Sequence, residues 1–487
     1  MRRFIGQTAI MAALCAVGAA VAAGALTIQE GVVPYQVLPC GADGTAAIVF
    51  KGAADGAGRV EARIAGMQKI VMDWTPLGEA ADGQWSGVLA GIPAGGPYRV
   101  DVRVVDAAGE TLETASVLEV LAGDLWVLAG QSNMQGVGNR FDVEEPHPQV
   151  HVFSMSHEWR RAEEPLHILG ESPDPVHCKA QNDAEREKAI SGWRDGPKGA
   201  GLGIPFAKEM ARRTGRPVGL IASAHGGTSM AQWDPALRDQ GGESLYGSMY
   251  RQVQAAGGVV RGVLWYQGES DANADAQPVF KEKFKALVAA MRRDFNAPEM
   301  PFYYVQIGRF VVEGRSADDW NKVQADQLAA ESEMDHTGMV ASIDLALDDL
   351  IHIGTPGLKT LGYRLANLAE RDLFGGSILP GPRPAAIERA ETRYGAQVRV
   401  RCSGINGGLQ AAGRVSGFSI SAGPAGPEFP CIYKQEIAAE DPEVVVLWVN
   451  KLPENPHLWY GRGLDPYCNV VDGAGMALPV FGPVPIP

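Results

Sequence analysis

The sequence is poor in cysteine, has no surplus of basic residues and contains no long apolar run beyond residue 23. Lys and Arg number 43 against 57 Asp and Glu, which gives a formal charge of −14. A chain this acidic repels a phosphate backbone and an anionic bilayer. No stretch after residue 23 has the roughly 20 apolar residues that a membrane-spanning helix needs. These deficits argue against a nucleic-acid partner and against a membrane-embedded body.

What is present suits a globular protein of several domains. Of the 487 residues, 46% are hydrophobic and 21% are charged. These proportions fill ordinary hydrophobic cores and exclude a disordered or collagen-like chain. At roughly 100–200 residues per domain, the length predicts about three domains.

The N-terminus has the features of a secretory signal peptide. Met1-Arg2-Arg3 supplies positive charge, and residues 9–21 are uncharged and mostly small and apolar. Small residues at 20–23 offer cleavage sites, so we expect a signal peptide over 1–23 and a secreted or periplasmic protein. An uncleaved membrane anchor is the alternative, but the apolar run is shorter than a spanning helix.

The cysteines predict a disulfide rather than a metal site. Cleavage at residue 23 would remove Cys15 and leave five cysteines in an oxidising compartment, so at least one stays unpaired. Their spacing matches no zinc pattern. We expect one bridge among the last three, with the pairing left open. The five are Cys40, Cys178, Cys402, Cys431 and Cys468.

Three kinds of pattern follow one another along the chain. Residues 24–118 hold short β-type runs between Gly- and Pro-rich turns, which predicts an N-terminal β-sandwich. Residues 119–375 alternate apolar runs of strand length with helical patterns, which predicts an α/β domain whose parallel sheet has helices on both faces. Residues 376–487 are β-rich again. The strands expected in the central sheet are 125–129, 150–153, 218–222, 259–266, 302–307 and 339–343.

Ser132 is the candidate nucleophile. It lies in the motif Gly-Gln-Ser-Asn-Met, residues 130–134, directly after the expected strand 125–129. Open parallel sheets place their sites at this carboxyl edge. Backbone N–H groups at a turn into a helix would stabilise an oxyanion there. For these five residues alone, a plain Ser-Asn turn is the alternative.

His352 is the candidate general base among nine histidines. It follows the last expected strand, and Asp349 lies three residues earlier. An acid so placed fixes the imidazole tautomer and stabilises the imidazolium that forms when histidine takes a proton. A solvated loop is the alternative for this pair. Five other histidines fall within residues 141–200 without a metal-ligand spacing, which favours a surface insertion over a zinc site.

An oxyanion hole is expected from three strand ends. Gly226 and Gly227 follow the strand 218–222, and Gln267 follows the strand 259–266. A glycine N–H and a glutamine amide are typical donors to an oxyanion. We therefore expect one of these glycines and the Gln267 amide to act with the Ser132 amide.

The same strand ends hold two candidate substrate contacts, His225 and Glu269. An alternative interpretation of Glu269 and Asp271 is the pair of catalytic carboxylates of a glycosidase. Both carboxylates follow one strand end, however, and no second acidic cluster stands opposite them.

Together these motifs resemble those of the sialate O-acetylesterase family of SGNH hydrolases. Residues 130–134 resemble the family's nucleophile block, and 226–228 its glycine block. Residues 265–271, Trp-Tyr-Gln-Gly-Glu-Ser-Asp, resemble its third block, in which Gln replaces the Asn of other SGNH enzymes. Residues 349–352, Asp-Leu-Ile-His, match the Asp-x-x-His of the last block. The resemblance implies a flavodoxin-like parallel sheet of the SGNH type.

The resemblance also implies a serine esterase that removes O-acetyl groups from carbohydrates with no metal or other cofactor. Two alternatives stay open. The first is an acetylxylan esterase or another polysaccharide esterase, and the second is a carbohydrate-binding protein on an inactive esterase scaffold. An anionic sugar such as sialate needs a local cation on a protein of this charge, and Arg140 and Arg309 are the candidates near the expected edge.

Overall fold

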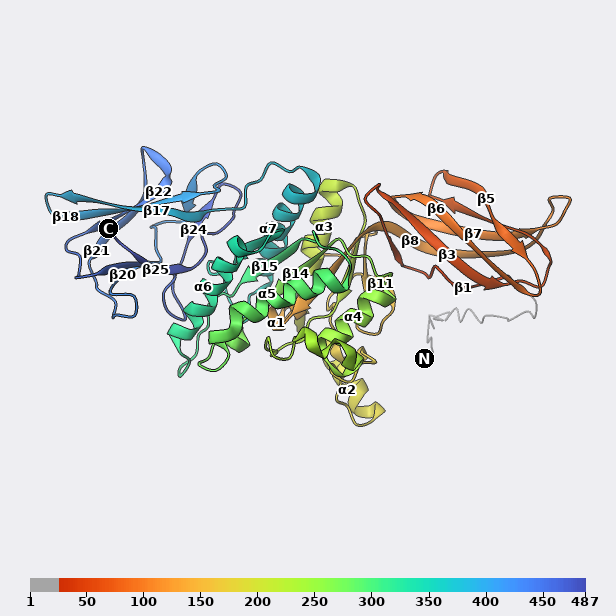
Figure 1. Cartoon of the computed structure of the whole chain (residues 1–487), viewed down its shortest axis with the longest axis horizontal. Helices are drawn as coiled ribbons and strands as arrows, with labels where there is room; N and C mark the ends of the chain where they lie inside the picture. Colours follow the sequence, from red (N-terminus) through yellow and green to blue (C-terminus); the bar gives the residue numbers. More distant parts are fainter. Residues whose placement is uncertain (1–25) are drawn as a thin grey trace, which may run out of the picture.

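The structure is a computed structural model that describes residues 26–487. The expected signal peptide, 1–23, lies outside the described residues. The molecule is elongated, with an α/β part in the middle and a β-rich part at each end (Figure 1). Over residues 26–487, no helix is long and apolar enough to cross a membrane.

The central part is built on a mixed sheet whose strand order is β11-β10-β13-β8-β14-β15-β16. All neighbours in this order are parallel except β10 and β11. Five of the six parallel strands, β10, β13, β14, β15 and β16, fall where the sequence predicts strands, and nearly all their residues are buried. The α/β class is therefore confirmed. The strands are β8 (Thr111–Gly130), β10 (Val150–Phe153), β11 (Trp159–Arg161), β13 (Val218–Ala222), β14 (Gly262–Tyr266), β15 (Phe302–Gln306) and β16 (Thr337–Ala341).

Helices cover both faces of this sheet. The neighbouring side chains of Tyr303 and Tyr304 on β15 point to opposite faces, as alternation along a strand requires. The Tyr303 hydroxyl donates to Asp372 on α7, whereas the Tyr304 hydroxyl donates to the Gln327 carbonyl on α6. The helices are α1 (Ser132–Gln135), α2 (Asp183–Arg194), α3 (Gly203–Thr214), α4 (Leu245–Ala255), α5 (Gln277–Asp294), α6 (Ala317–Glu333) and α7 (Thr355–Phe374), with short 3₁₀ turns η1 (Leu169–Glu171), η2 (Pro235–Glu243) and η3 (Glu269–Asp271).

The N-terminal part packs two sheets around its own hydrophobic core. One sheet has the order β1-β3-β6, and the other contains β4, β5 and β7 and joins the central sheet through β8. The expected domain boundary after residue 118 therefore falls inside one continuous strand of 20 residues. The remaining strands here are β1 (Thr27–Glu30), β2 (Val37–Pro39), β3 (Thr45–Ala53), β4 (Gly58–Ala65), β5 (Ile70–Ala80), β6 (Gln84–Pro93) and β7 (Gly95–Val105).

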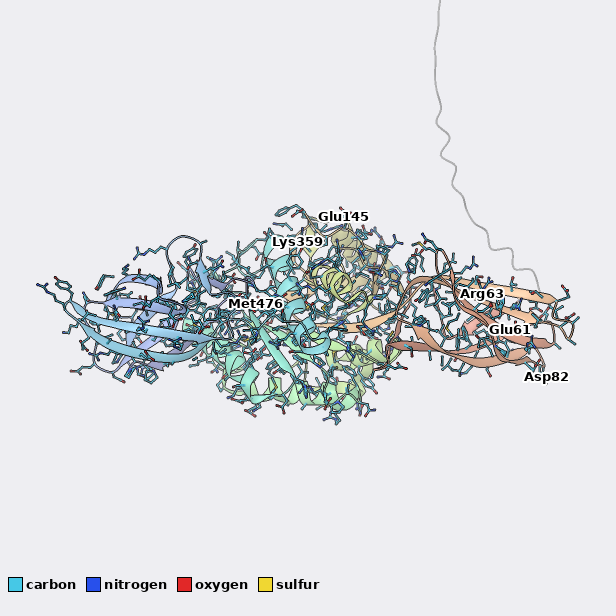
Figure 2. The ribbon with its side chains drawn as sticks, turned by 90° about the horizontal axis from the view of Figure 1, so that it is seen from above. Glu61, Arg63, Asp82, Glu145, Lys359 and Met476 are labelled. Atoms are coloured by element: carbon cyan, nitrogen blue, oxygen red, sulfur yellow. The ribbon has the colours of Figure 1, made fainter. Side chains whose placement is uncertain are left out.

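The C-terminal part has three small antiparallel sheets around a further core. Met476 is an exception, because it packs into the central core, and Figure 2 places it where the two parts meet. The strands are β17 (Arg383–Thr392), β18 (Gly395–Ser403), β19 (Leu409–Ala411), β20 (Phe418–Ala422), β21 (Ile432–Ala438), β22 (Asp441–Val449), β23 (Pro456–Tyr460), β24 (Val470–Asp472) and β25 (Phe481–Pro485). Two short strands, β9 (Gly138–Asn139) and β12 (Lys198–Ala200), pair within the central part.

The expected disulfide is wrong. All five cysteines among residues 26–487 are free thiols. Cys402, Cys431 and Cys468 are each buried in the C-terminal core and pack there as small apolar side chains. Burial raises the pKa of the Cys402 and Cys468 thiols to about 12.

Residues 141–200 are also more deeply placed than a surface insertion. This segment supplies β10, which pairs with β13 inside the central sheet. His151, His167 and His177 are accordingly buried. The strand 150–153 was predicted, and the expectation of a surface insertion is wrong because this strand anchors the segment inside the sheet.

Candidate active site

Three adjacent parallel strands deliver the candidate residues to one edge of the sheet. The strands β13, β8 and β14 are neighbours, and each runs directly into a loop that the sequence singled out. Because parallel strands share their carboxyl edge, Ser132 follows β8 beside Gly226, which follows β13. The loop before α7 brings His352 to the same edge.

Gly130 makes the sharp turn that presents Ser132. Its φ is +130°, and a Cβ at this position would lie 2.3 Å from the Tyr266 carbonyl oxygen, so only glycine fits. The Gln131 N–H donates to that same carbonyl at 2.8 Å and fixes the turn. Ser132 then opens the short helix α1, and its amide donates to no acceptor within residues 26–487.

His352 and Asp349 form a hydrogen-bonded pair. The two Asp349 oxygens lie 2.9 and 3.0 Å from His352 Nδ1, and the amides of Ile351 and His352 also donate to this carboxylate. Partial burial opposes ionisation of Asp349, but these hydrogen bonds outweigh it and hold its pKa below the usual range. An ionised acid on Nδ1 leaves His352 Nε2 as the basic nitrogen.

A cavity of about 410 Å³ contains both candidate groups, and we call it the carboxyl-edge cavity. Ser132 and His352 line it without a hydrogen bond between their side chains, which is common for catalytic pairs before substrate binds. Its size lies within the range of small-ligand pockets. The lining residues are Gln131, Ser132, Gln135, Val137, Trp193, Gly226, Gly227, Glu269, Ser270, Phe310, Arg315, Ile351 and His352.

The structure supports only part of the expected oxyanion hole. Gln267 is fully buried outside the cavity, and its amide nitrogen donates to the Thr228 carbonyl and to Asp271. The Gly226 amide donates to Gln135 Oε1 at 2.7 Å. Both groups already have partners, so neither is a donor to substrate. The Gly227 amide donates to no acceptor in the described chain and remains available.

Glu269 lines the cavity as a buried acid, 4% exposed. It accepts a hydrogen bond from the Asn133 side chain at 2.9 Å. Burial raises the pKa of Glu269 to about 7, although the Asn133 bond opposes this shift. Asp271 points elsewhere and accepts from Gln267 and the Met230 amide. The two acids therefore do not face each other across a substrate site, and the glycosidase alternative has no support.

His225 is held by a chain of buried polar groups that the sequence did not reveal. Ser248 donates its one proton to Asp174 at 2.6 Å, so it accepts from His177 Nε2 at 3.1 Å. Burial lowers the pKa of His177 to about 3, which keeps this ring neutral, and its Nδ1 lies 3.0 Å from His225 Nδ1. His225 therefore carries its proton on Nδ1 and has a free acceptor at Nε2.

Neither expected cation lines the carboxyl-edge cavity. Arg309 pairs with Asp465 at 2.9 Å, and Arg140 donates to the Arg194 carbonyl at 2.6 Å. Arg315 is the cation that lines the cavity, in the loop after β15, and no ion pair is formed by it within residues 26–487. Arg315 follows the predicted strand 302–307, so its place after a strand end could have identified it as a candidate from the sequence.

We expect Asp349→Asn to lower kcat on the order of 10²-fold, because an amide no longer fixes the His352 tautomer or stabilises its charged form. Asp348→Asn is the matched control. Asp348 accepts from the Asn139 amide at 2.7 Å and does not contact the His352 ring, so this variant should keep most of its turnover. Steady-state kinetics on an acetyl ester measures kcat of both variants. If both lose kcat equally and mildly, the site works as a Ser-His pair without Asp349.

A serine and an aspartate-bound histidine in one cavity at the carboxyl edge of a parallel sheet is the arrangement typical of serine hydrolases. The model of the carbohydrate esterase family described as sialic acid-specific acetylesterase matches residues 122–371, just over half of the chain. The chain belongs to this family, whose members are carboxylic ester hydrolases.

Individual relatives agree with this assignment. The chain is 27% identical to human sialate O-acetylesterase over 372 residues, which cover 66% of this chain and 67% of the human one. It is 27% identical over 255 residues to a protein of Arabidopsis thaliana named as a probable carbohydrate esterase, covering 46% of this chain and 87% of that one. A crystal structure of a carbohydrate acetylesterase from Xanthomonas citri superposes with a TM-score of 0.64 at 21% identity, covering 94% and 99% of the two chains, which shows a shared fold.

Proposed function

We propose that the protein is a serine esterase that removes O-acetyl groups from carbohydrates through an acetyl-enzyme on Ser132. The observation that carries the proposal is that Ser132 and the Asp349-bound His352 line one cavity. We further propose that the central sheet is of the SGNH type, with catalytic residues drawn from 119–375. The N-terminal sandwich (24–118), the C-terminal β-rich domain (376–487) and export to the periplasm or medium belong to the same proposal.

The reaction needs only groups of this chain and water. Ser132 Oγ attacks the acetyl carbonyl carbon while His352 Nε2 takes the hydroxyl proton. The tetrahedral intermediate then breaks its bond to the sugar oxygen, which receives that proton from His352. Water attacks the acetyl-Ser132 ester, again losing a proton to His352. The bond between the acetyl carbon and Ser132 Oγ then breaks, Oγ takes the proton back from His352, and the acetic acid released ionises in solvent.

The amides of Ser132 and Gly227 are the proposed oxyanion donors. Neither donates a hydrogen bond within residues 26–487, and both residues line the cavity. Donors fixed in place before the reaction stabilise the charge that appears on the carbonyl oxygen, and one such donor is typically worth about 10²–10³ in kcat.

The walls of the carboxyl-edge cavity suit a sugar. Trp193 lines the cavity as an aromatic side chain, whereas the Phe310 ring is stacked on Trp320. His225 does not line the cavity but precedes Gly226, which does, so we propose its Nε2 as an acceptor for a sugar hydroxyl. These features serve any acetylated sugar, including xylan. Arg315 favours an anionic one, because a guanidinium binds a carboxylate through two hydrogen bonds. We therefore propose an O-acetylated sialic acid ahead of neutral polysaccharide.

Arg315→Ala should raise KM for O-acetylated sialic acid about tenfold, the value of one hydrogen bond between charged groups. Its KM for acetylated xylo-oligosaccharide should not change, since that substrate has no carboxylate. Arg315→Lys should recover part of the loss. Arg309→Ala is the control, because Asp465 already neutralises that arginine. Kinetics on both substrates gives the ratio of their KM values. If this ratio is the same in Arg315→Ala as in the wild type, the support for an anionic substrate is lost.

Turnover of a chromogenic acetyl ester tests the function itself. Release of the chromophore by the wild-type chain, and its loss in Ser132→Ala, is the expected result. Sugar binding without any hydrolysis would instead identify a carbohydrate-binding protein on an esterase scaffold. A panel of acetylated glycans then ranks sialate against xylan.

A further inference from the structure

Asn133, the residue after Ser132, is buried and holds the loop that carries His352. Its Oδ1 accepts the Ile353 N–H at 3.0 Å, and its Nδ2 lies 3.4 Å from the Ile351 carbonyl oxygen. His352 lies between these two backbone groups. One amide side chain therefore holds the chain on both sides of the histidine.

Glu269 fixes the orientation of this amide. Its Oε1 accepts from Asn133 Nδ2 at 2.9 Å. A flipped Asn133 amide would place oxygen against the Glu269 oxygen and would place N–H against the Ile353 N–H. The contact with the Ile353 N–H would be repulsive, and so would the contact with an ionised Glu269, so these two groups together select the orientation that the His352 loop requires.

A role for Glu269 in stability alone does not explain its placement. Its second oxygen, Oε2, is buried and has no hydrogen-bond partner within residues 26–487. A buried carboxyl with an unsatisfied oxygen costs stability, and an apolar residue of similar volume would cost less. The same carboxyl lies in the cavity that contains Ser132 and His352, where its contact with Asn133 bears on the reaction.

We propose that Asn133 is the positioning residue that sets the separation of Ser132 from His352, with Glu269 keeping it in orientation. The inference rests on the proposed esterase function. Asn133 is covalently next to the nucleophile and hydrogen-bonded to the histidine loop, so it joins the two reacting groups into one unit. The buried side chain of Ile353 and the Val311 N–H, which donates to the Leu350 carbonyl at 2.8 Å, also hold this loop, but neither is attached to the nucleophile. Misplacing a reacting group by about 1 Å costs about 10²-fold in rate.

Asn133→Ala and Glu269→Ala are the test variants, measured in the full chain on a chromogenic acetyl ester. Each should lower kcat, by about 10²-fold for Asn133→Ala, with little change in KM. The double variant should be no slower than Asn133→Ala, because the two residues act through one contact chain. Glu269→Gln keeps an acceptor oxygen for Asn133 and should recover most of the kcat lost in Glu269→Ala.

Asn406 provides a matched control far from the cavity. Its Nδ2 donates to Asp472 at 2.7 Å and to the Leu379 carbonyl at 3.2 Å, and its Oδ1 accepts the Leu379 N–H at 2.7 Å. This repeats the bonding pattern of Asn133. Asn406→Ala should lower the free energy of unfolding and leave kcat of the folded protein unchanged.

Two outcomes would overturn the inference while leaving the esterase proposal intact. One is a wild-type kcat in folded Asn133→Ala, and the other is strictly multiplicative loss in the double variant. Failure of Glu269→Gln to exceed Glu269→Ala would remove Glu269 from the proposal. Wild-type turnover in Ser132→Ala would instead overturn the proposed function on which the inference rests.

Discussion

Ser132→Ala should lower kcat on the order of 10⁴-fold or more, because the lost hydroxyl oxygen is the atom that forms the acetyl ester. The variant should still fold. The Ser132 hydroxyl forms no hydrogen bond within residues 26–487 and is not part of the hydrophobic core, so its removal leaves no unsatisfied partner and no cavity. Acetyl-ester kinetics together with a thermal unfolding curve separates the chemical loss from misfolding.

Ser270→Ala is the control for this experiment. Ser270 lines the same cavity, but it is not next to the turn at Gly130 and has no proposed base. Its variant should turn over close to the wild-type rate. A Ser132→Ala variant that kept a tenth of its activity would rule out Ser132 as the nucleophile.

His352→Ala should be nearly as damaging, with a loss of roughly 10³-fold or more in kcat. A serine hydroxyl is a weak nucleophile at neutral pH unless a base takes its proton. His352 is also the proposed acid for the departing sugar oxygen, so a substrate with a poor leaving group should suffer more than a chromogenic ester. Comparing the two substrates measures this second role.

His336→Asn is the control for the histidine. His336 lies before β16, at the opposite edge of the sheet, and its φ of +52° suits asparagine. This variant should keep its turnover. Retention of turnover in His352→Ala equal to that of the control would show that another group takes the proton.

The parallel sheet could be predicted because its strands are buried on both faces and are therefore continuously apolar, as in β13 and β14. The junction with the N-terminal sandwich could not. β8 belongs to the sandwich over its first half and to the central sheet over its second half. Burial alternates along the first half of β8 and is continuous along the second half. In the sequence these two patterns look like two separate strands, although the strand is unbroken.

The parts of the candidate site that could be predicted are those in which the interacting residues are close together in the sequence. Asp349 and His352 are three residues apart, and one turn of backbone pairs them. The Thr228 partner of Gln267 and the partners of Gly226 and Arg309 come from distant segments, so no local pattern shows that these groups are already hydrogen-bonded or ion-paired. The link from Asn133 to the His352 loop spans more than 200 residues and was missed for the same reason.

Labelling with a fluorophosphonate tests the central claim most directly, because this reagent forms a stable bond to an activated serine and does not depend on an accumulating intermediate. We expect one adduct per chain, located on the peptide that contains Ser132, with esterase activity lost in proportion to labelling. We also expect no adduct in His352→Ala, because Ser132 has no base in that variant. Full inactivation with the adduct on another residue, or full activity with Ser132 modified, would show that Ser132 is not the nucleophile.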